Sequence, residues 1–226
     1  MTQVASQIIK KLKSLSNPKN VAGMARFGIN SQKTLGVNVP VLRQMAKEIG
    51  KNHQLALQLW DSGYHEARIL AGFIDETEKV TEKQMEKWAK DFDSWDICDQ
   101  TCSSLFDKTD FVWQKIEGLT KRKEEFVKRT GFTLMACLAV HDKKAQDKDF
   151  IKLLLMIKRE ATDERNFVKK AVNWALRQIG KRNKNLNKEA IKVAQEILKI
   201  DNKTAKWIAT DALRELTSEN VRERLN

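Results

Sequence analysis

The sequence predicts an all-α fold, in which helix pairs stack into a curved superhelical solenoid with a concave basic groove. The chain has 226 residues with only two prolines and nine glycines, too few for the many turns of an all-β protein. Apolar residues recur at helical spacing almost throughout, and similar segments return after about 40 residues. We expect a single domain over residues 1–226.

Apolar spacing and capping residues define the expected helices. Residues 1–15 form an amphipathic helix, and further helix starts are predicted at SNP (16–18), TEKQ (81–84) and NKE (187–189). The segment 27–40 carries glycine and proline and is expected to be irregular. No segment shows the strict alternation of a half-buried strand.

The chain repeats itself in segments that start at Phe126, Phe167 and Trp207. The first two share the start FVK[RK] 41 residues apart, and the third matches the second with an offset of 37 residues. One helix pair cannot bury its apolar face alone, so neighbouring pairs must stack into a continuous core. Three amphipathic helices without common ancestry are the alternative, which the shared start makes weaker.

Equivalent positions of stacked repeats line one wall of a solenoid. The alignment pairs Lys128 with Lys169 and Arg129 with Lys170. We therefore expect a basic stripe whose spacing follows the repeat, a geometry that suits a polyanionic rod better than a small anion.

Positive charge is concentrated in the C-terminal half of the chain. The formal net charge is +12, from 42 Lys and Arg against 30 Asp and Glu. Residues 1–120 contribute +1 and residues 121–226 contribute +11. This asymmetry indicates a polyanionic partner such as nucleic acid. Lysines that only keep helix surfaces soluble would give the same balance.

Cysteine and histidine offer little support for a metal-centred or Ser/His-centred mechanism. The cysteines are odd in number and lie in apolar stretches, as reduced core thiols do: Cys98, Cys102 and Cys137. No spacing completes a zinc site, and the phosphate-binding loops GxxxxGK[ST] and GxGxxG do not occur. We expect neither a metal nor a cofactor.

No apolar run approaches the ~18–20 residues that a membrane span needs. Residues 1–15 lack the apolar block and cleavage site of a signal peptide. The expected location is the cytoplasm, with nucleoid association in a bacterium, and no membrane partner is expected. A solenoid with polar ends is expected to be a monomer.

One group of residues suits chemistry on a cationic substrate. Trp95 and Asp99 are four residues apart and share a helix face, and Trp174 follows Lys170 by four residues. The inferred site is a carboxylate flanked by indole faces inside a basic groove.

Each of these residues also has a structural interpretation. Asp96 is interpreted as a charge at a helix start. Asp99 could instead form a salt bridge with Arg129, and Trp174 could fill the core.

Other residues that draw attention are assigned to the fold. Glu66 and Arg68 are interpreted as a structural ion pair. The remaining tryptophans are interpreted as packing or surface residues: Trp60, Trp88, Trp113 and Trp207.

The segments that carry these residues resemble, in order and spacing, the DNA alkylation-repair enzymes of the AlkD type, glycosylases built from HEAT-like helical repeats. The similarity covers most of the chain and runs through GVNVPVLR (36–43), YHEAR (64–68), WDICD (95–99), KR (128–129) and KAVNWALR (170–177). In that family the last aspartate of the WDxxD segment is catalytic, and its tryptophan belongs to the active site.

The resemblance implies that Asp99 and Trp95 have these roles here, with Arg129 and Trp174 completing the catalytic set. It also implies DNA contacts from the flanking basic residues, which are Lys128, Arg129, Lys169, Lys170 and Arg177. The implied partner is duplex DNA that contains alkylated bases.

The implied activity is that of a monofunctional DNA glycosylase. It would hydrolyse the N-glycosidic bond of positively charged N3- or N7-alkylated purines without a base-specific pocket. Two other functions stay open: non-catalytic binding of bent or branched DNA, and a protein-interaction solenoid whose groove holds an acidic partner.

Overall fold

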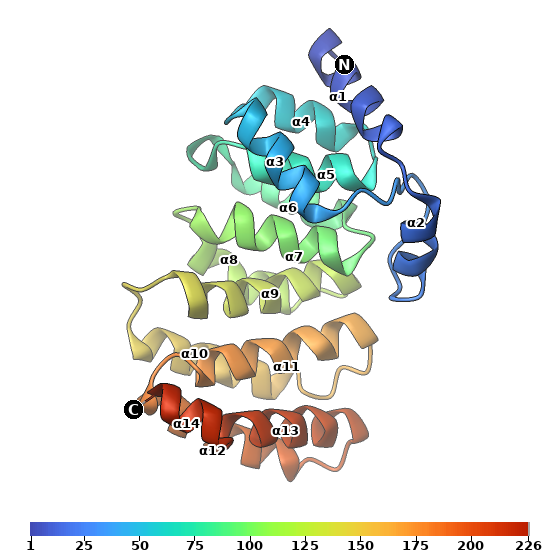
Figure 1. The fold of residues 1–226 in the computed structure, drawn as a ribbon. Coiled ribbons are helices and arrows are strands. Elements are labelled where there is room, and N and C mark those ends of the chain that lie inside the picture. Colours follow the sequence, from blue (N-terminus) through green and yellow to red (C-terminus); the bar gives the residue numbers. More distant parts are fainter. Residues whose placement is uncertain (226) are drawn as a thin grey trace. The chain divides into compact units, whose positions relative to one another are not determined.

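The structure is a computed structural model and describes residues 1–225. Within this range it contains fourteen α-helices and two short 3-10 helices, η1 and η2, and no strand (Figure 1). The predicted all-α class is confirmed. Contacts along the chain divide it into two compact units, Met1–Asp110 and Phe111–Asn226. The single domain expected from the sequence stays a prediction.

Unit 1 is built from short helices around an aromatic core. Its elements are α1 (Gln3–Ser14), α2 (Pro18–Ala25), α3 (Val39–Ile49), α4 (His53–Asp61), α5 (His65–Ile74), η1 (Thr77–Lys79), α6 (Glu82–Asp91), α7 (Trp95–Ser104) and η2 (Phe106–Lys108). Trp60 and Trp88 are fully buried and stack with ring centroids 3.8 Å apart, which confirms their packing role. The predicted core thiols are confirmed as well, because all three cysteines are buried and none is joined in a disulfide.

Unit 2 contains the five longest helices, α9 to α13, which have 13 to 17 residues, and in Figure 1 α9, α11 and α13 lie one below another. They are α8 (Val112–Thr120), α9 (Glu125–His141), α10 (Asp147–Arg159), α11 (Asn166–Gly180), α12 (Lys184–Leu198), α13 (Lys203–Leu216) and α14 (Glu219–Leu225). Trp113 on α8 packs edge-on against Phe150 of α10, as expected for a packing residue.

Three helices of unit 2 share one burial pattern. The buried positions correspond across the 41- and 37-residue offsets of the repeat. They are Val127, Thr130, Gly131 and Leu134 in α9, Val168, Ala171, Val172 and Ala175 in α11, and Ala205, Ile208, Ala209 and Ala212 in α13. The rings of Phe126 and Phe167, which are equivalent, stack at 5.4 Å. The repeat read from the sequence is therefore present in the fold.

Two of the three predicted helix starts are confirmed. The side chain of Asn17 caps α2, whose first residue is Pro18, and the hydroxyl of Thr81 caps α6. Residues 26–38 form the irregular segment between α2 and α3, close to the predicted 27–40.

The third predicted start is wrong by about one turn. Asn183, not Asn187, caps α12, and its side-chain oxygen accepts a hydrogen bond from the N–H of Leu186. Asn187 lies inside the helix and donates to the carbonyl oxygens of Gly180 and Leu216. An asparagine that bonds to neighbouring elements in this way resembles a cap in the sequence but serves packing.

A buried carboxylate anchors the irregular segment. Glu66 on α5 is fully buried and accepts hydrogen bonds from the backbone N–H groups of Leu35, Gly36 and Val37. Gly36 has a φ of +78°, and a Cβ there would lie 2.4 Å from the carbonyl oxygen of Asn17. Glycine is therefore required where the chain passes over Glu66.

The predicted ion pair between Glu66 and Arg68 is wrong. Arg68 instead donates a 2.9 Å hydrogen bond to the backbone oxygen of Asp91, and its guanidinium lies 5.5 Å from the ring centroid of Trp60. Residues two apart on a helix point in different directions, so their opposite charges do not meet.

Buried charges connect α9 to the segment after α10. The ammonium of Lys128 lies 2.6 Å from the carboxylate of Glu160 and 2.8 Å from that of Asp163. Burial alone would raise the pKa of Asp163, but hydrogen bonds from Arg165 and Lys128 outweigh it and hold this pKa at about 2.

Replacing Glu66 with Gln should lower the free energy of unfolding by about 2–4 kcal/mol, because an amide N–H would face backbone N–H groups that need an acceptor. Urea denaturation followed by circular dichroism measures the change. The exposed Glu78→Gln is the matched control and should alter stability by less than about 0.5 kcal/mol. Equal stability of the two variants would show that the buried carboxylate does not anchor the segment.

Acid should weaken unit 2 through Asp163. Its pKa is lowered from 3.8 to about 2, so the ionised carboxylate stabilises the fold above about pH 4 and loses this effect as the pH falls through 2. The contribution is about 2 kcal/mol. Thermal unfolding between pH 5 and pH 2 should therefore show a smaller loss of stability in Asp163→Asn than in the wild type. Asp201→Asn, at a fully exposed carboxylate, should keep the wild-type slope.

Candidate functional site

The WDxxD segment begins α7 and is held by the irregular segment. Trp95 is the first residue of the helix and is half-buried. Its indole N–H donates to the carbonyl oxygen of Phe27 at 3.1 Å, and the N–H of Asn30 donates to the hydroxyl of Ser94 at 3.0 Å. Because Glu66 anchors the same segment, the orientation of the indole depends on that buried carboxylate.

A buried histidine meets the same helix start. His65 is 3% exposed, and its Nε2 lies 2.8 Å from a carboxylate oxygen of Asp96. The other oxygen of Asp96 accepts the N–H of Ile97 in the first turn of α7, so the predicted role at a helix start is confirmed. Sequence reasoning missed His65, because 31 residues separate it from Asp96 and no spacing rule connects them.

Asp99 lies one turn after Trp95 on the same side of α7. Both side chains are half-buried, whereas Ile97, Cys98 and Cys102 are fully buried. The helix therefore presents one apolar interior face and one face that carries the indole and the carboxylate.

The two basic residues at the start of α9 are buried. Arg129 is 5% exposed, and its guanidinium donates to the backbone oxygen of Phe167 at 2.6 Å. Lys128 forms ion pairs with Glu160 and Asp163. Contacts of either residue with DNA stay predictions.

The candidate residues of α11 are more accessible. Lys170 is exposed, and Lys169 and Trp174 are half-buried. Trp174 therefore does not belong to the fully buried core.

Arg177, one turn further along α11, is engaged by carboxylates of α13. It pairs with Asp211 and Glu215, and Lys181 also binds Glu215 at 2.6 Å. Burial would raise the pKa of Glu215, but the hydrogen bonds from Lys181 and Arg177 lower it below its usual value. Much of the positive charge at this position is neutralised within the unit.

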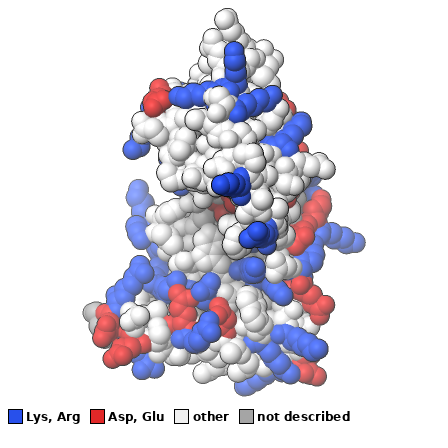
Figure 2. All heavy atoms as spheres, turned by 45° about the vertical axis from the view of Figure 1, so that its right-hand side comes forward, with Lys and Arg blue, Asp and Glu red and all other residues white. Residues whose placement is uncertain are grey.

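Acidic side chains accompany the basic ones on the surface of unit 2. Figure 2 shows blue and red atoms interspersed over the lower part of the molecule, where α10 to α14 lie. On the face that Figure 2 shows, the basic side chains of this part of the chain are thus mixed with acidic ones.

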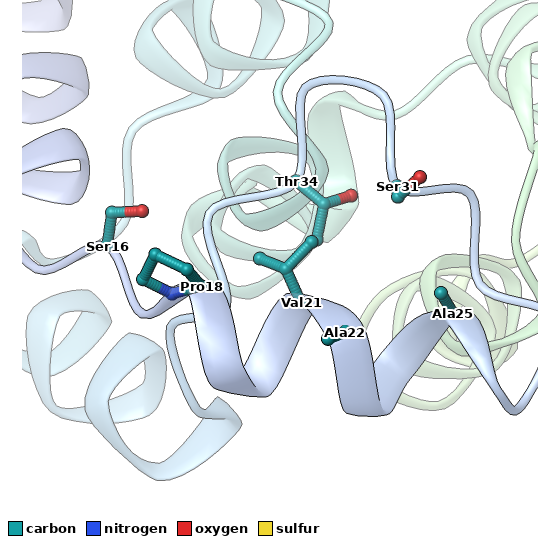
Figure 3. A pocket seen from close by; sticks show the side chains of 7 residues that line it. All are labelled: Ser16, Pro18, Val21, Ala22, Ala25, Ser31 and Thr34. Carbon is teal, nitrogen blue, oxygen red and sulfur yellow. The ribbon is translucent and has the colours of Figure 1, made fainter.

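No group of three His, Cys, Asp or Glu side chains that could hold a metal ion occurs in residues 1–225. An open cavity of about 450 Å³ lies between α2 and residues 31–34, and its side chains are small, apolar or hydroxyl-bearing (Figure 3). With no ionisable group in its lining, it offers nothing to acid–base or electrostatic catalysis. None of the described helices has the length and apolar character to cross a membrane.

The four predicted catalytic residues belong to different units. Trp95 and Asp99 lie in unit 1, and Arg129 and Trp174 lie in unit 2. Their assembly into one site stays a prediction.

Comparison with solved structures identifies the fold. The chain is similar to a protein described as belonging to "a new family of proteins related to the HEAT-like repeat DNA glycosylases with affinity for branched DNA structures". The TM-score is 0.78 at 19% identity, over 97% of this chain and 95% of that one. The HEAT-like repeat fold predicted from the resemblance is thus confirmed. An engineered protein gives a TM-score of 0.39 at 13% identity, over 96% of this chain and 99% of that one. A designed armadillo repeat protein gives a TM-score of 0.34 at 12% identity, over 81% of this chain and 88% of that one. Both scores are too low to indicate a shared fold.

Comparison of sequences identifies the family. No curated protein matches the chain. A family model described as "DNA alkylation repair enzyme" matches residues 8–216, which include α7, α9 and α11 with all candidate residues. The chain therefore belongs to the DNA alkylation repair enzyme family.

Proposed function

We propose that the protein is a monofunctional DNA glycosylase that removes positively charged N3- or N7-alkylated purines from duplex DNA. The observation that carries the proposal is the face of α7 on which Trp95 and Asp99 lie together, outside the apolar interior. Membership of the DNA alkylation repair enzyme family supports it.

Asp99 is the proposed catalytic carboxylate. A purine alkylated at N3 or N7 carries a positive charge and is already a good leaving group. Breaking its N-glycosidic bond places positive charge on the deoxyribose, as in glycoside hydrolysis. A fixed carboxylate stabilises that charge and orients the attacking water. No strong general acid is required, so the reaction does not need His65, which is buried against Asp96.

The tryptophans are proposed to favour the cationic nucleotide. Indole faces of Trp95 and Trp174 attract a positive ring by roughly 0.5–2 kcal/mol each. The hydrogen bond from Trp95 to Phe27 restricts this indole before DNA binds. Such preorganisation reduces the entropy that binding would otherwise cost.

DNA binding is proposed to depend mainly on Lys169 and Lys170, with Arg129 beside the lesion phosphate. The carboxylate partners of Lys128 and Arg177 reduce the charge that these two residues can offer. Selectivity would then come from the lability of cationic adducts, since no base-specific pocket is proposed. We also propose a cytoplasmic monomer that needs no cofactor.

A second candidate is non-catalytic binding of branched DNA. The observation that favours it is the similarity in fold to a protein whose family has affinity for branched DNA structures. Trp95 and Asp99 would then be residues of the binding surface without a chemical role.

Asp99→Asn distinguishes the two candidates. It removes the charge that stabilises the transition state, so base release should fall at least about 100-fold. Binding to duplex DNA should be unchanged or tighter, because a negative charge near phosphates is lost. Release of N7-methylguanine from a methylated duplex, measured by mass spectrometry, gives the rate, and fluorescence anisotropy gives the affinity.

The exposed Asp110→Asn is the matched control in unit 1 and should keep the wild-type rate. No base release by the wild type, together with tight binding to a four-way junction, would replace the glycosylase with the branched-DNA binder.

Trp174→Ala should reduce base release by roughly 2- to 30-fold and change the dissociation constant less, because its contact is strongest with the developing cation. Trp174→Phe keeps an aromatic face and should recover part of the rate. Thermal unfolding of both variants provides the check. A large loss of stability in Trp174→Ala would support the alternative that this residue fills the core.

Lys170→Ala should weaken binding to all DNA sequences and reduce the slope of log affinity against log salt by about 1. Its charge is exposed, so stability should not change. Lys188→Ala, which removes an exposed charge from α12, is the matched control. An equal effect of the two variants would mean that the position of Lys170 has no special role in DNA binding.

A further inference from the structure

The repeat gives Trp207 an unexpected place in unit 2. The offsets of 41 and 37 residues make it the equivalent of Arg129 and Lys170. The flanking positions agree, since Val168 and Ala171 of α11 and their counterparts Ala205 and Ile208 of α13 are all fully buried. A position that carries a cation in two repeats therefore carries an indole in the third.

The indole of Trp207 is accessible and has cations around it. It is 43% exposed, although tryptophan is usually well buried. The ammonium of Lys169 lies 5.7 Å from the ring centroid, and Lys170 and Lys206 are exposed at the equivalent and adjacent positions of the repeat. Lys206 is also paired with Asp201, an exposed contact that salt and solvent screen. The surface thus combines an aromatic face with positive charge.

This combination suits bases that are not stacked in a duplex. A lysine or arginine at this position would attract phosphate by its positive charge, which an indole lacks. An aromatic face gains most by stacking on a nucleobase, and such a platform flanked by cations is typical of proteins that bind single strands. Inside a duplex the base faces are covered by their neighbours, so stacking on Trp207 favours unpaired nucleotides.

We infer that Trp207, with Lys169, Lys170 and Lys206, binds unpaired nucleotides that flank the duplex held by the protein. The inference rests on the proposed DNA-binding function and adds a second contact, one repeat beyond Trp174. The protein would therefore prefer DNA in which a duplex continues into a single strand.

The test compares a blunt, unmodified duplex with the same duplex extended by about eight thymidines, a length within the range of known single-strand sites. Overhangs at the 3′ and 5′ ends are both measured by fluorescence anisotropy at low salt. The wild type should bind one overhang substrate about tenfold more tightly than the blunt duplex. Trp207→Ala should abolish this preference and leave the affinity for the blunt duplex within about twofold.

Two further variants sharpen the test. Trp207→Lys restores the cation of the preceding repeats, and it should bind the blunt duplex more tightly while losing the preference for the overhang. Leu155→Ala removes another exposed apolar side chain, from α10, and should behave as the wild type. Circular dichroism melting should be unchanged in all three variants, because both side chains are exposed.

The outcomes separate this inference from the proposed function. The inference is overturned if the wild type binds the blunt duplex as tightly as both overhang duplexes, or if Trp207→Ala keeps the preference for an overhang. Neither result contradicts the proposed glycosylase activity. Release of N7-methylguanine from a blunt duplex by Trp207→Ala should match the wild type. Absence of wild-type binding to either substrate overturns both.

Discussion

The burial of one apolar face in each repeat of unit 2 is the constraint on which the arrangement of its candidate residues depends. Val127, Val168 and Ala205 occupy the same interior position in α9, α11 and α13. Because a helix has a fixed period, burying this position also fixes which residues point away from the core. The environments of Arg129, Lys170 and Trp207 follow from that register and from what lies beside each helix.

The basic residues of unit 2 serve two purposes: some form ion pairs within the fold, and others are available to a polyanion. Lys128 and Arg177 bind carboxylates in their own unit, and the pKa of Asp163 is held at about 2 by such contacts. These pairs connect neighbouring helices and at the same time reduce the charge available to a polyanion. Lys169 and Lys170 are more accessible. Fewer residues are therefore available to attract DNA than the net charge of +12 suggests.

The proposed reaction requires mainly that the protein position a carboxylate and aromatic side chains beside the substrate. A cationic purine needs no strong acid to leave, so a carboxylate and aromatic faces are sufficient. In unit 1 these groups are held by residues remote in sequence: Glu66 anchors the segment whose Phe27 carbonyl binds Trp95, and His65 pairs with Asp96. Orientation of α7 therefore depends on buried polar contacts as well as on apolar packing.

The sequence by itself determined the helical class, the repeat, the position of the irregular segment and the shared face of Trp95 and Asp99, because helical periodicity and capping are local properties. Only the tertiary structure decided the partners of Glu66, His65 and Lys128. It also showed that Asn183 caps α12, where the sequence predicted Asn187. The partners in these contacts lie about 30 positions apart in the sequence. The two candidate caps of α12 are both asparagines, so the residue type does not distinguish them. Buried polar groups must find partners wherever the fold provides them, and no local pattern records which one is used.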